Sequence, residues 1–397
     1  MTNPSPLRTL IEAEAAAKSS TAPQAGADRP GAATGQRPPL EPEWLPWGPG
    51  TDETPSPMLL ATLGTIELEY AAIRRSVGRL DATHRGTVRL TGDDRLDLLD
   101  RLLTQQVCDL QDGDIAEAFL LDRTGRVQSD LVVLHTADAT WLDVDAHQAH
   151  LTATTLEAMC FGEDVAIAEV TGTHHRIELH GPSAGDVLTA MGFEPPEPMH
   201  VTQRGSMLLW RLDRVGVPGW AMCMPADDAP AIWMSISGPS SNGDRCGRTI
   251  GWYALNMARV ETGEPMANID FGTGNLPAET GVLHRRVSFT KGCYPGQEVV
   301  ARMHNLGHPK QVLRTLVLDD DRLPIAGAQI FSGDDADLAA PLGAVTSSAP
   351  APLAGSRPVA MGMVRWLIAT PGTRVQVMAD GKGVEAHVQP IEGDMQP

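Results

Sequence analysis

Three adjacent segments of the chain follow the polar–apolar alternation of β-strands and are separated by very short connections. They read EAFLLD (117–122), VQSDLVVLH (127–135) and TWLDVDA (140–146), joined by the turns DRTGR and TADA. Connections this short join antiparallel neighbours, because parallel strands need a crossover of about a dozen residues. The sequence therefore predicts an antiparallel meander, which rules out a fold made purely of βαβ units.

Helical and strand patterns surround the meander without a regular β–α–β order, which indicates the α+β class. Helical periodicity is found at 66–77, 93–107, 148–160, 184–192 and 249–263. Further strands are predicted at 86–92, 165–171, 174–181, 206–213 and 219–225. After Pro309 only short strands with Gly and Pro turns follow, at 311–320, 328–333, 341–349, 358–365 and 373–379. We expect these last strands to form a small barrel or sandwich that begins near residue 308.

The first 57 residues differ in composition from the rest of the chain. They hold eleven of the 31 prolines, and Ala, Gly, Ser and Thr supply most of the remainder. Such a segment lacks the apolar surface needed to offset its loss of conformational entropy, so we predict a disordered tail. Trp44 and Trp47 are candidates for a short anchor, although an exposed pair is an equal alternative. The predicted domains are the tail at 1–57, an α+β region at 58–307 and a barrel at 308–397.

Charge and cysteine content limit the classes of function. The chain has 50 acidic and 31 basic side chains, a formal net charge of −19. This acidity argues against a nucleic-acid or anionic-membrane partner, because affinity for phosphate comes mainly from Lys and Arg. The five cysteines form no Cys-x-x-Cys pair, which predicts free thiols and no metal site built from closely spaced ligands. Without an apolar stretch of about 18 residues or a secretory signal, the expected location is the cytoplasm.

The segment KGCYPGQEVVAR (291–302) gives one cysteine a setting that favours reactivity. The Pro-Gly pair after Tyr294 suits the start of a helix, and Cys293 would lie just ahead of it. There the positive end of the helix dipole favours thiolate over thiol. Lys291 adds positive charge, and Arg302 does so if the helix folds back. We therefore predict a reactive, partly exposed thiol; the alternative is a buried cysteine that fills space beside a turn.

Two other motifs resemble a metal site and a dinucleotide-binding site but lack features that such sites require. His304 and His308 have the spacing of two metal ligands on one helix face. Gly307 and Pro309 are expected to end the helix there, so we predict surface histidines and no metal site. The glycines of GTGNLP follow no clear strand and open no helix, which excludes a dinucleotide fingerprint.

The cysteine segment resembles the signature K-G-C-[YF]-x-G-Q-E-x-x-x-R of the YgfZ-type folate-binding proteins, a family similar to the T-protein (aminomethyltransferase) of the glycine cleavage system. The resemblance extends over most of residues 58–397. It is carried by GRLDATHRGTVRLTGDDRLDLLDRLLTQQV, LLDRTGRVQSDLVV, ALNMARVETGEP, LPAET and GAVTSSAPAP. It implies a ring of three domains around a channel that binds tetrahydrofolate, with two α+β domains and a small C-terminal β-barrel.

The resemblance also implies which residues contact the folate. Asp130, Trp252, Arg259 and Glu261 are the candidates, on the meander and on the helix predicted at 249–263. Each has a structural alternative: a solvated strand face for Asp130, a core position for Trp252, and a structural ion pair for the other two. Two departures from T-proteins stand out, because Ser129 replaces the first of two adjacent aspartates and VGVPGWAMCMP lacks the glutamate that contacts the pterin.

These features lead to one favoured function and two alternatives. The favoured one is a tetrahydrofolate-binding accessory protein that helps to assemble or repair [4Fe–4S] clusters, with iron–sulfur client enzymes or cluster carriers as partners. Cys293 would act as the thiolate, Lys291 and Arg302 would keep it ionised, and Gln297 and Glu298 would orient the loop. The first alternative is a folate-dependent aminomethyltransferase or demethylase that uses Asp130. The second is a folate-binding scaffold in which the cysteine is inert.

Overall fold

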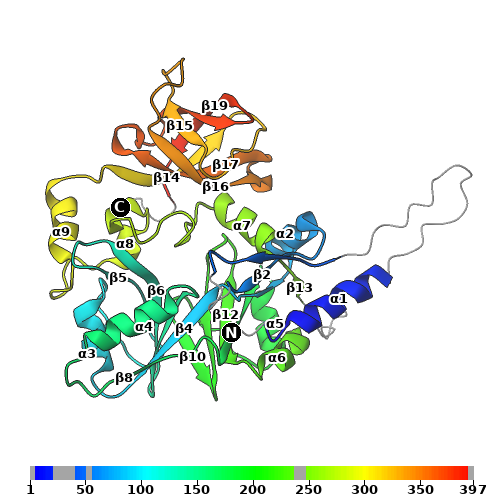
Figure 1. The fold of residues 1–397 in the computed structure, drawn as a ribbon. Coiled ribbons are helices and arrows are strands. Elements are labelled where there is room, and N and C mark those ends of the chain that lie inside the picture. Colours follow the sequence, from blue (N-terminus) through cyan, green and yellow to red (C-terminus); the bar gives the residue numbers. More distant parts are fainter. Residues whose placement is uncertain (1–4, 21–40, 51–55, 237–246, 392–397) are drawn as a thin grey trace, which may run out of the picture.

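The computed structural model describes residues 5–20, 41–50, 56–236 and 247–391. These residues form two β-sheets and a closed six-stranded barrel, and helix α7 (Trp252–Glu261) lies between the barrel and the sheets (Figure 1). The predicted α+β class with a C-terminal barrel is confirmed. None of the helices in the described part of the chain is long and apolar enough to cross a membrane.

The predicted meander is the edge of a five-stranded sheet with the order β5-β6-β7-β4-β8. All its neighbouring strands are antiparallel. The strands are β4 (Arg85–Thr91), β5 (Ile115–Leu121), β6 (Val127–His135), β7 (Thr140–Asp145) and β8 (Ala166–Glu169). Leucines of α3 (Arg95–Leu102) and small residues of α4 (Ala149–Ala158) cover one face of the sheet and form its core.

The second sheet has six strands in the order β10-β11-β12-β9-β3-β13. They are β3 (Gly78–Asp81), β9 (His174–His180), β10 (Val201–Arg204), β11 (Met207–Arg211), β12 (Gly219–Pro225) and β13 (Arg248–Thr249). Helices α5 (Ala184–Ala190) and α6 (Ala229–Ile236) contribute to the core on one face. The other face meets the first sheet through a core that includes Trp141 and Trp210. The two sheets therefore pack together as one body.

The barrel closes in the order β14-β17-β16-β15-β18-β19 around an apolar interior. Its strands are β14 (Gln311–Leu318), β15 (Gln329–Ser332), β16 (Gly343–Ala351), β17 (Arg357–Arg365), β18 (Arg374–Ala379) and β19 (Lys382–Gln389). Helix α7 contacts β16 and β17 on one side and α2 (Ile66–Arg75) on the other. This helix thereby joins the barrel to the rest of the molecule.

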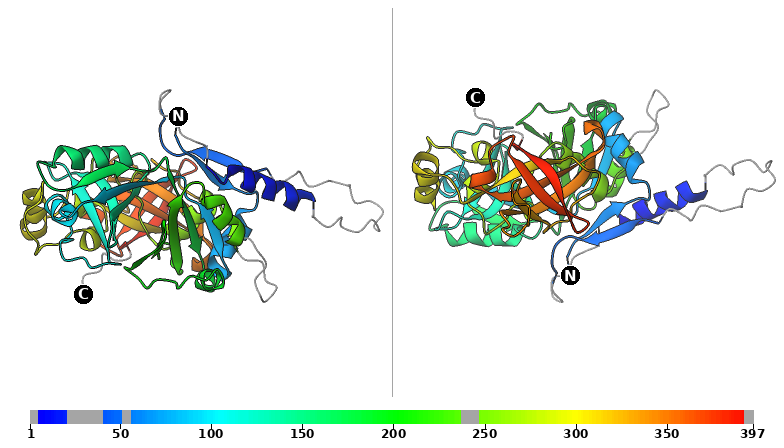
Figure 2. Two further views of the ribbon diagram at one scale, coloured as in Figure 1. Left: turned by 90° about the horizontal axis from the view of Figure 1, so that it is seen from below. Right: turned by 90° about the horizontal axis from the view of Figure 1, so that it is seen from above.

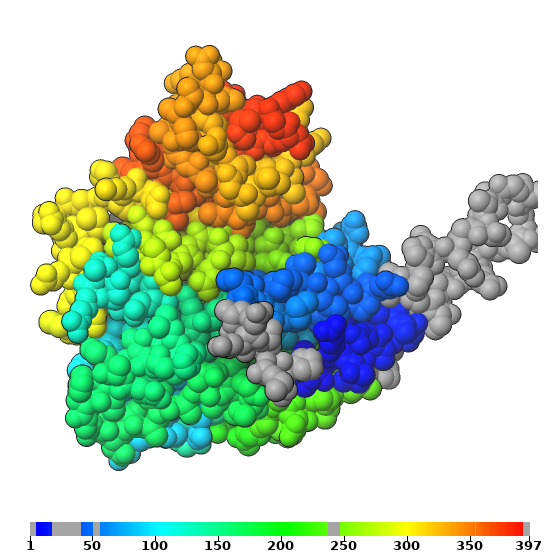
Figure 3. Space-filling model, viewed as in Figure 1, coloured from blue at the N-terminus to red at the C-terminus, as the bar shows by residue number. Residues whose placement is uncertain are grey.

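Parts of the N-terminal segment are folded, so the prediction of a disordered tail is wrong for them. Residues of α1 (Arg8–Ser20) complete the core of the six-stranded sheet, where Leu7 and Ile11 are fully buried. Strand β1 (Glu43–Pro46) pairs with β2 (Met58–Thr62). The helix and the two strands run along one side of the molecule (Figures 2 and 3). The remaining tail positions, 1–4, 21–40 and 51–55, lie outside the described residues.

The composition of the N-terminal segment explains why its folded parts were not predicted from the sequence. Leu7, Ile11 and Ala15 recur every four positions and form a narrow buried stripe. The surrounding residues are rich in Ala and Pro, so the average hydrophobicity of a long window stays low. A buried ion pair strengthens the docking, because Glu14 Oε2 lies 2.6 Å from Arg79 Nη2, and the Arg79 side chain is only 3% exposed.

We expect Ile11→Ala to lower the free energy of unfolding by about 2–4 kcal/mol, because it removes a fully buried side chain from the core. Glu12→Ala is the matched control on the same helix; Glu12 makes an exposed pair with Arg8, and its loss should cost about 0.5 kcal/mol or less. Urea unfolding of both variants measures the difference. Equal stability of the two variants would show that α1 does not dock in solution.

Candidate functional site

A pocket opens where the two sheets converge on α7, and the empty space in it, including the open solvent at its mouth, is about 450 Å³. Its walls come from the segment before and at the start of β4, from β9, from the β11–β12 connection, from α7 and from the turn after α7. The lining residues are His84, Arg85, Arg176, Glu178, His180, Leu212, Arg214, Val215, Leu255, Arg259, Glu264, Pro265 and Met266.

One wall of the pocket is a row of polar side chains on β9. Because strand side chains alternate, Arg176, Glu178 and His180 share one face, while Ile177 and Leu179 belong to the core on the other. Arg176 Nη2 lies 2.8 Å from Glu178 Oε1, and His180 Nε2 lies 2.8 Å from Glu178 Oε2. All three polar side chains are at most 5% exposed.

The electrostatics of this wall follow from its ion pairs. Burial alone would raise the pKa of Glu178, but Arg176 and the hydrogen bond from His180 hold it well below the usual range. Burial lowers the pKa of His84 to about 3, so this imidazole is neutral. Among the described residues, His84 Nδ1, His180 Nδ1 and Arg176 Nε are buried and have no hydrogen-bond partner. The wall therefore contains buried polar atoms that have no partner among the described residues.

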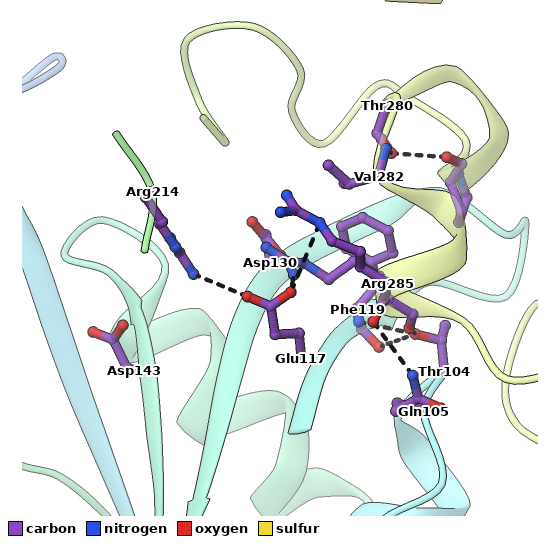
Figure 4. Close-up of polar contacts among 12 residues, drawn as sticks. Thr104, Gln105, Glu117, Phe119, Asp130, Asp143, Arg214, Thr280, Val282 and Arg285 are labelled. Carbon is purple, nitrogen blue, oxygen red and sulfur yellow. Dashed lines mark hydrogen bonds and ion pairs between the residues drawn. The ribbon is translucent and has the colours of Figure 1, made fainter. Parts of the chain in front are cut away.

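A second cluster of charges lies beside the pocket and contains the predicted Asp130. Its Oδ1 accepts a hydrogen bond of 2.7 Å from Arg286 Nε, and Arg286 also pairs with Glu117. Arg214 and Arg285 approach Glu117 at 3.6 and 3.9 Å (Figure 4). Since Arg214 also lines the pocket, ion pairs connect Asp130 to the pocket wall.

The three arginines give Glu117 a pH-dependent contribution to stability. Burial raises its pKa, but Arg286, Arg214 and Arg285 outweigh burial and lower the pKa from 4.5 to about 2. Because the folded pKa is the lower one, this contribution is fully present above the unfolded value and is lost as the pH falls toward 2. It amounts to about 3 kcal/mol at neutral pH.

We therefore expect Glu117→Gln to be less stable than the wild type at pH 7, with a difference that shrinks steadily between about pH 5 and pH 2. Urea unfolding at several pH values measures this difference. Glu157→Gln is the control, because Glu157 is an exposed residue of α4 that contacts none of these arginines in the described structure. A difference that stays constant with pH would contradict the assigned charge pairing.

The other predicted folate contacts lie on α7 and have structural partners. Arg259 lines the pocket, and its Nη1 lies 2.6 Å from Asp270 Oδ2. Trp252 packs beside Trp47 and His84, with ring centroids 5.1 and 6.2 Å apart.

Glu261 belongs to a different environment, at the junction of α7, α2 and the barrel. Its carboxylate accepts hydrogen bonds from Arg74 at 2.6 Å, from Tyr70 at 2.5 Å and from the backbone N–H of Leu353 at 2.7 Å. Neither Glu261 nor Trp252 is among the residues that line the pocket. The structure thus brings Arg259 to the pocket and places Glu261 in a structural contact.

The predicted cysteine loop lies apart from the pocket lining. Helix α9 (Gln297–Leu306) follows Gly296, which has a φ of +80° and lies too close to the backbone of Gly125 to carry a side chain. Cys293 is exposed ahead of this helix.

Lys291 is held by backbone carbonyl groups of another segment. Lys291 Nζ donates to the carbonyl oxygens of Asp100, of Leu103 at 2.9 Å and of Gln105 at 3.0 Å, so it anchors the loop to the end of α3. Gln297 is half-buried, and Glu298 and Arg302 are exposed on α9.

The two histidines at the end of α9 turn to different aromatic rings. His304 stacks on Phe289 with centroids 3.8 Å apart, and His308 stacks on Trp366 at 4.9 Å. This arrangement does not bring the two imidazoles together as a ligand pair.

Sequence reasoning missed most of the pocket. His84, Arg176, Glu178, His180 and Arg214 were not among the predicted contacts. A usable signal is present in HHRIELH, where charged or polar residues alternate with Ile and Leu on a strand that is buried on both faces. Charged side chains at buried positions need partners, and such clusters are frequent at functional sites.

Comparisons with protein families and with individual proteins point to the same family. Residues 60–291 match the GCVT N-terminal domain family, and residues 311–391 match the glycine cleavage T-protein C-terminal barrel domain. An aminomethyltransferase of Streptomyces coelicolor is 25% identical over 346 residues, which are 84% of this chain and 87% of that protein. One of Saccharopolyspora erythraea is 26% identical over 331 residues, covering 81% and 87%.

A solved structure shares the fold. The aminomethyltransferase T of the glycine cleavage system from Bartonella henselae superimposes with a TM-score of 0.78 at 21% identity, over 90% of this chain and 95% of that one. The order of the two matched domains along the chain, sheets first and barrel second, is the order seen in the structure. This chain therefore belongs to the GCVT family, with an N-terminal GCVT domain followed by a glycine cleavage T-protein C-terminal barrel.

Proposed function

We propose that this protein binds tetrahydrofolate in the pocket at β9 and α7 and catalyses transfer of a one-carbon unit, as an aminomethyltransferase. The observation that carries the proposal is the pocket itself, with unpartnered buried polar atoms in its wall. Relatives that cover more than four-fifths of the chain are aminomethyltransferases, which supports this activity over the iron–sulfur role favoured from the sequence. Tetrahydrofolate is the cofactor used by aminomethyltransferases of this family.

The residues present fit a pterin ring, which is flat and carries N–H donors and a carbonyl. His84 Nδ1 and His180 Nδ1 are buried ring nitrogens without a partner among the described residues, and Arg176 Nε is a donor without one. Leu212, Val215 and Leu255 supply apolar surface. The VGVPGWAMCMP segment has no acid, and Glu178 on the neighbouring strand provides a buried carboxylate in the same pocket.

The positively charged side chain of Arg214 lines the pocket and can bind the acidic tail of a folate. Arg214 is 21% exposed and its pair with Glu117, at 3.6 Å, is longer than a hydrogen bond. Its guanidinium can therefore bind a carboxylate of the ligand. Bound tetrahydrofolate supplies the nitrogen that accepts the carbon. Asp130 contributes indirectly, because it holds Arg286 against Glu117.

A direct assay tests the proposal. The purified protein is mixed with tetrahydrofolate and the aminomethylated carrier protein of a glycine cleavage system, and formation of methylenetetrahydrofolate is followed. We expect turnover that requires the protein and falls in His84→Ala, with little change in His150→Ala, an exposed residue of α4. Absence of turnover together with absence of folate binding would reject the proposal.

A second candidate function rests on Cys293. This thiol is exposed at the start of α9, away from the pocket lining, and its segment carries the full YgfZ-type signature. It could engage an iron–sulfur client while the pocket holds folate. Deleting the gene and assaying a [4Fe–4S] enzyme alongside glycine cleavage separates the two functions. Loss of the cluster enzyme alone, restored by wild type and not by Cys293→Ala, would favour this second function.

A further inference from the structure

The N-terminal segment reaches the wall of the pocket through Trp47. This buried residue follows β1 and lies outside residues 60–291, which match the GCVT N-terminal domain. Its ring centroid lies 5.1 Å from that of His84, which lines the pocket, and 5.1 Å from that of Trp252. The centroids of His84 and Trp252 are 6.2 Å apart, so the three rings form a triangle. Trp47 is not among the lining residues and therefore packs on the wall from outside the pocket.

Hydrogen bonds fix both the side chain and the backbone of Trp47. Its Nε1 donates to Oδ2 of the buried Asp145 at 2.9 Å. Its backbone N–H donates to the carbonyl oxygen of Pro57 at 2.8 Å, and its own carbonyl oxygen accepts a hydrogen bond from His147 Nε2. Because a buried carboxylate is costly without its donors, the bond to Asp145 favours this one position of the indole ring.

His84 is the member of the triangle that lines the pocket, and it is buried. Burial lowers the pKa of its imidazole to about 3. The charged groups around it are Arg85 of β4, Asp143 of β7, and Arg176 and Glu178 of β9. The two acids raise this pKa and the two arginines lower it, so burial decides its direction. The charge state of His84 therefore reports whether the wall is closed to water.

Trp252 connects the triangle to a second part of the lining. The guanidinium carbon of Arg259 lies 5.7 Å from the centroid of the Trp252 ring, and Arg259 lines the pocket. Trp47 thus supports two lining residues that are far apart in the chain: His84, through direct ring contact, and Arg259, through Trp252.

We propose that Trp47 is a positioning residue of the folate pocket, which holds His84 and Trp252 in the arrangement that the ligand requires. This inference deepens the proposed function and rests on it. Without the indole, both rings can move into the space that it leaves, so the wall has its binding arrangement for only part of the time. The apparent affinity falls in proportion to that fraction. The N-terminal segment is thereby part of the binding site, although none of its described residues lines the pocket.

A binding comparison on the full-length protein tests the proposal. Calorimetry with 5-formyltetrahydrofolate is carried out on wild type, Trp47→Ala, Trp47→Phe and the control Trp44→Ala. Trp44 belongs to β1 in the same segment, but it packs on the core of the six-stranded sheet and is absent from the pocket lining. We expect Trp47→Ala to bind about tenfold or more weakly than wild type. Trp47→Phe keeps an aromatic ring against the wall, so it should bind within about threefold of wild type, as should Trp44→Ala.

The titration of His84 tests the same contact without a ligand. Its imidazole resonances are followed by NMR from about pH 5 to about pH 8. The wild-type ring should stay neutral over this range, because burial lowers its pKa. Trp47→Ala admits water to the ring, so the pKa should rise toward its usual value of 6.5 and the resonances should titrate. Trp44→Ala should behave like the wild type.

Three results would overturn the role of Trp47. The first is equal affinity of Trp47→Ala and wild type, and the second is an equal loss of affinity in the folded Trp47→Ala and Trp44→Ala variants. The third is a wild-type His84 that titrates like an exposed histidine, and this result counts even if Trp47→Ala does not fold. A folded wild type that binds no folate would instead reject the proposed function.

Discussion

Replacing Arg286 with methionine is expected to lower the free energy of unfolding by about 3–5 kcal/mol. The arginine side chain is 2% exposed and pairs with both Asp130 and Glu117. Methionine fills much of the same volume but leaves two nearly buried carboxylates without their main counter-ion. The cost arises from the uncompensated charges, so it should exceed the loss of an ordinary core contact.

Arg101 supplies the control for this prediction. It lies on α3, is 52% exposed and pairs with Glu163 at 2.6 Å. We expect Arg101→Met to cost about 1 kcal/mol or less, because solvent screens an exposed ion pair. Chemical denaturation of both variants at pH 7 gives the comparison. Similar losses for the two variants would mean that the burial of Arg286 between two carboxylates does not set the cost.

Asp270→Ala is expected to cause a loss of similar size, about 3–5 kcal/mol, at the contact between the barrel and the rest of the protein. Asp270 is fully buried and pairs with Arg259 of α7 at 2.6 Å. It also accepts hydrogen bonds from Ser347 and Thr346 of β16, at 2.6 and 2.8 Å. Removing it leaves the Arg259 guanidinium buried without a counter-ion and breaks the polar link to the barrel.

Limited proteolysis adds a structural readout to the unfolding measurement. In Asp270→Ala we expect faster cleavage near residues 307–310, where the chain enters the barrel, because the barrel is less firmly docked. Asp334→Ala is the control, since Asp334 is 91% exposed and pairs with Arg374 at the barrel surface. Unchanged stability and cleavage in Asp270→Ala would show that apolar packing alone holds the barrel in place.

The sequence was sufficient for the fold class because the meander and the barrel strands carry strong local patterns. The turns DRTGR and TADA dictate antiparallel pairing, and the structure has it between β5, β6 and β7. The N-terminal helix was missed for the opposite reason. The buried stripe of Leu7, just before this helix, and of Ile11 and Ala15 within it is stabilised by the core of a distant sheet, which no local window reveals.

The site was predictable only in part, since it is assembled from segments far apart in the chain. Arg259 was found because a motif marked it, and it lines the pocket. Glu261 belongs to the same motif, but it lies two residues after Arg259 and therefore on another face of the helix. There it contacts Arg74 and Tyr70. Asp130 pairs with Arg286, which also pairs with Glu117, and such long-range pairs leave no mark in the local pattern.

The central claim is that the pocket between β9 and α7 binds a folate, and calorimetric titration with 5-formyltetrahydrofolate tests it most directly. Wild type, Arg214→Ala and Arg211→Ala are compared; Arg211 pairs with Asp213 and does not line the pocket. We predict binding by the wild type, a loss of about tenfold or more in Arg214→Ala, and no change in Arg211→Ala. No binding by the folded wild type, or equal affinity of all three proteins, would contradict the account.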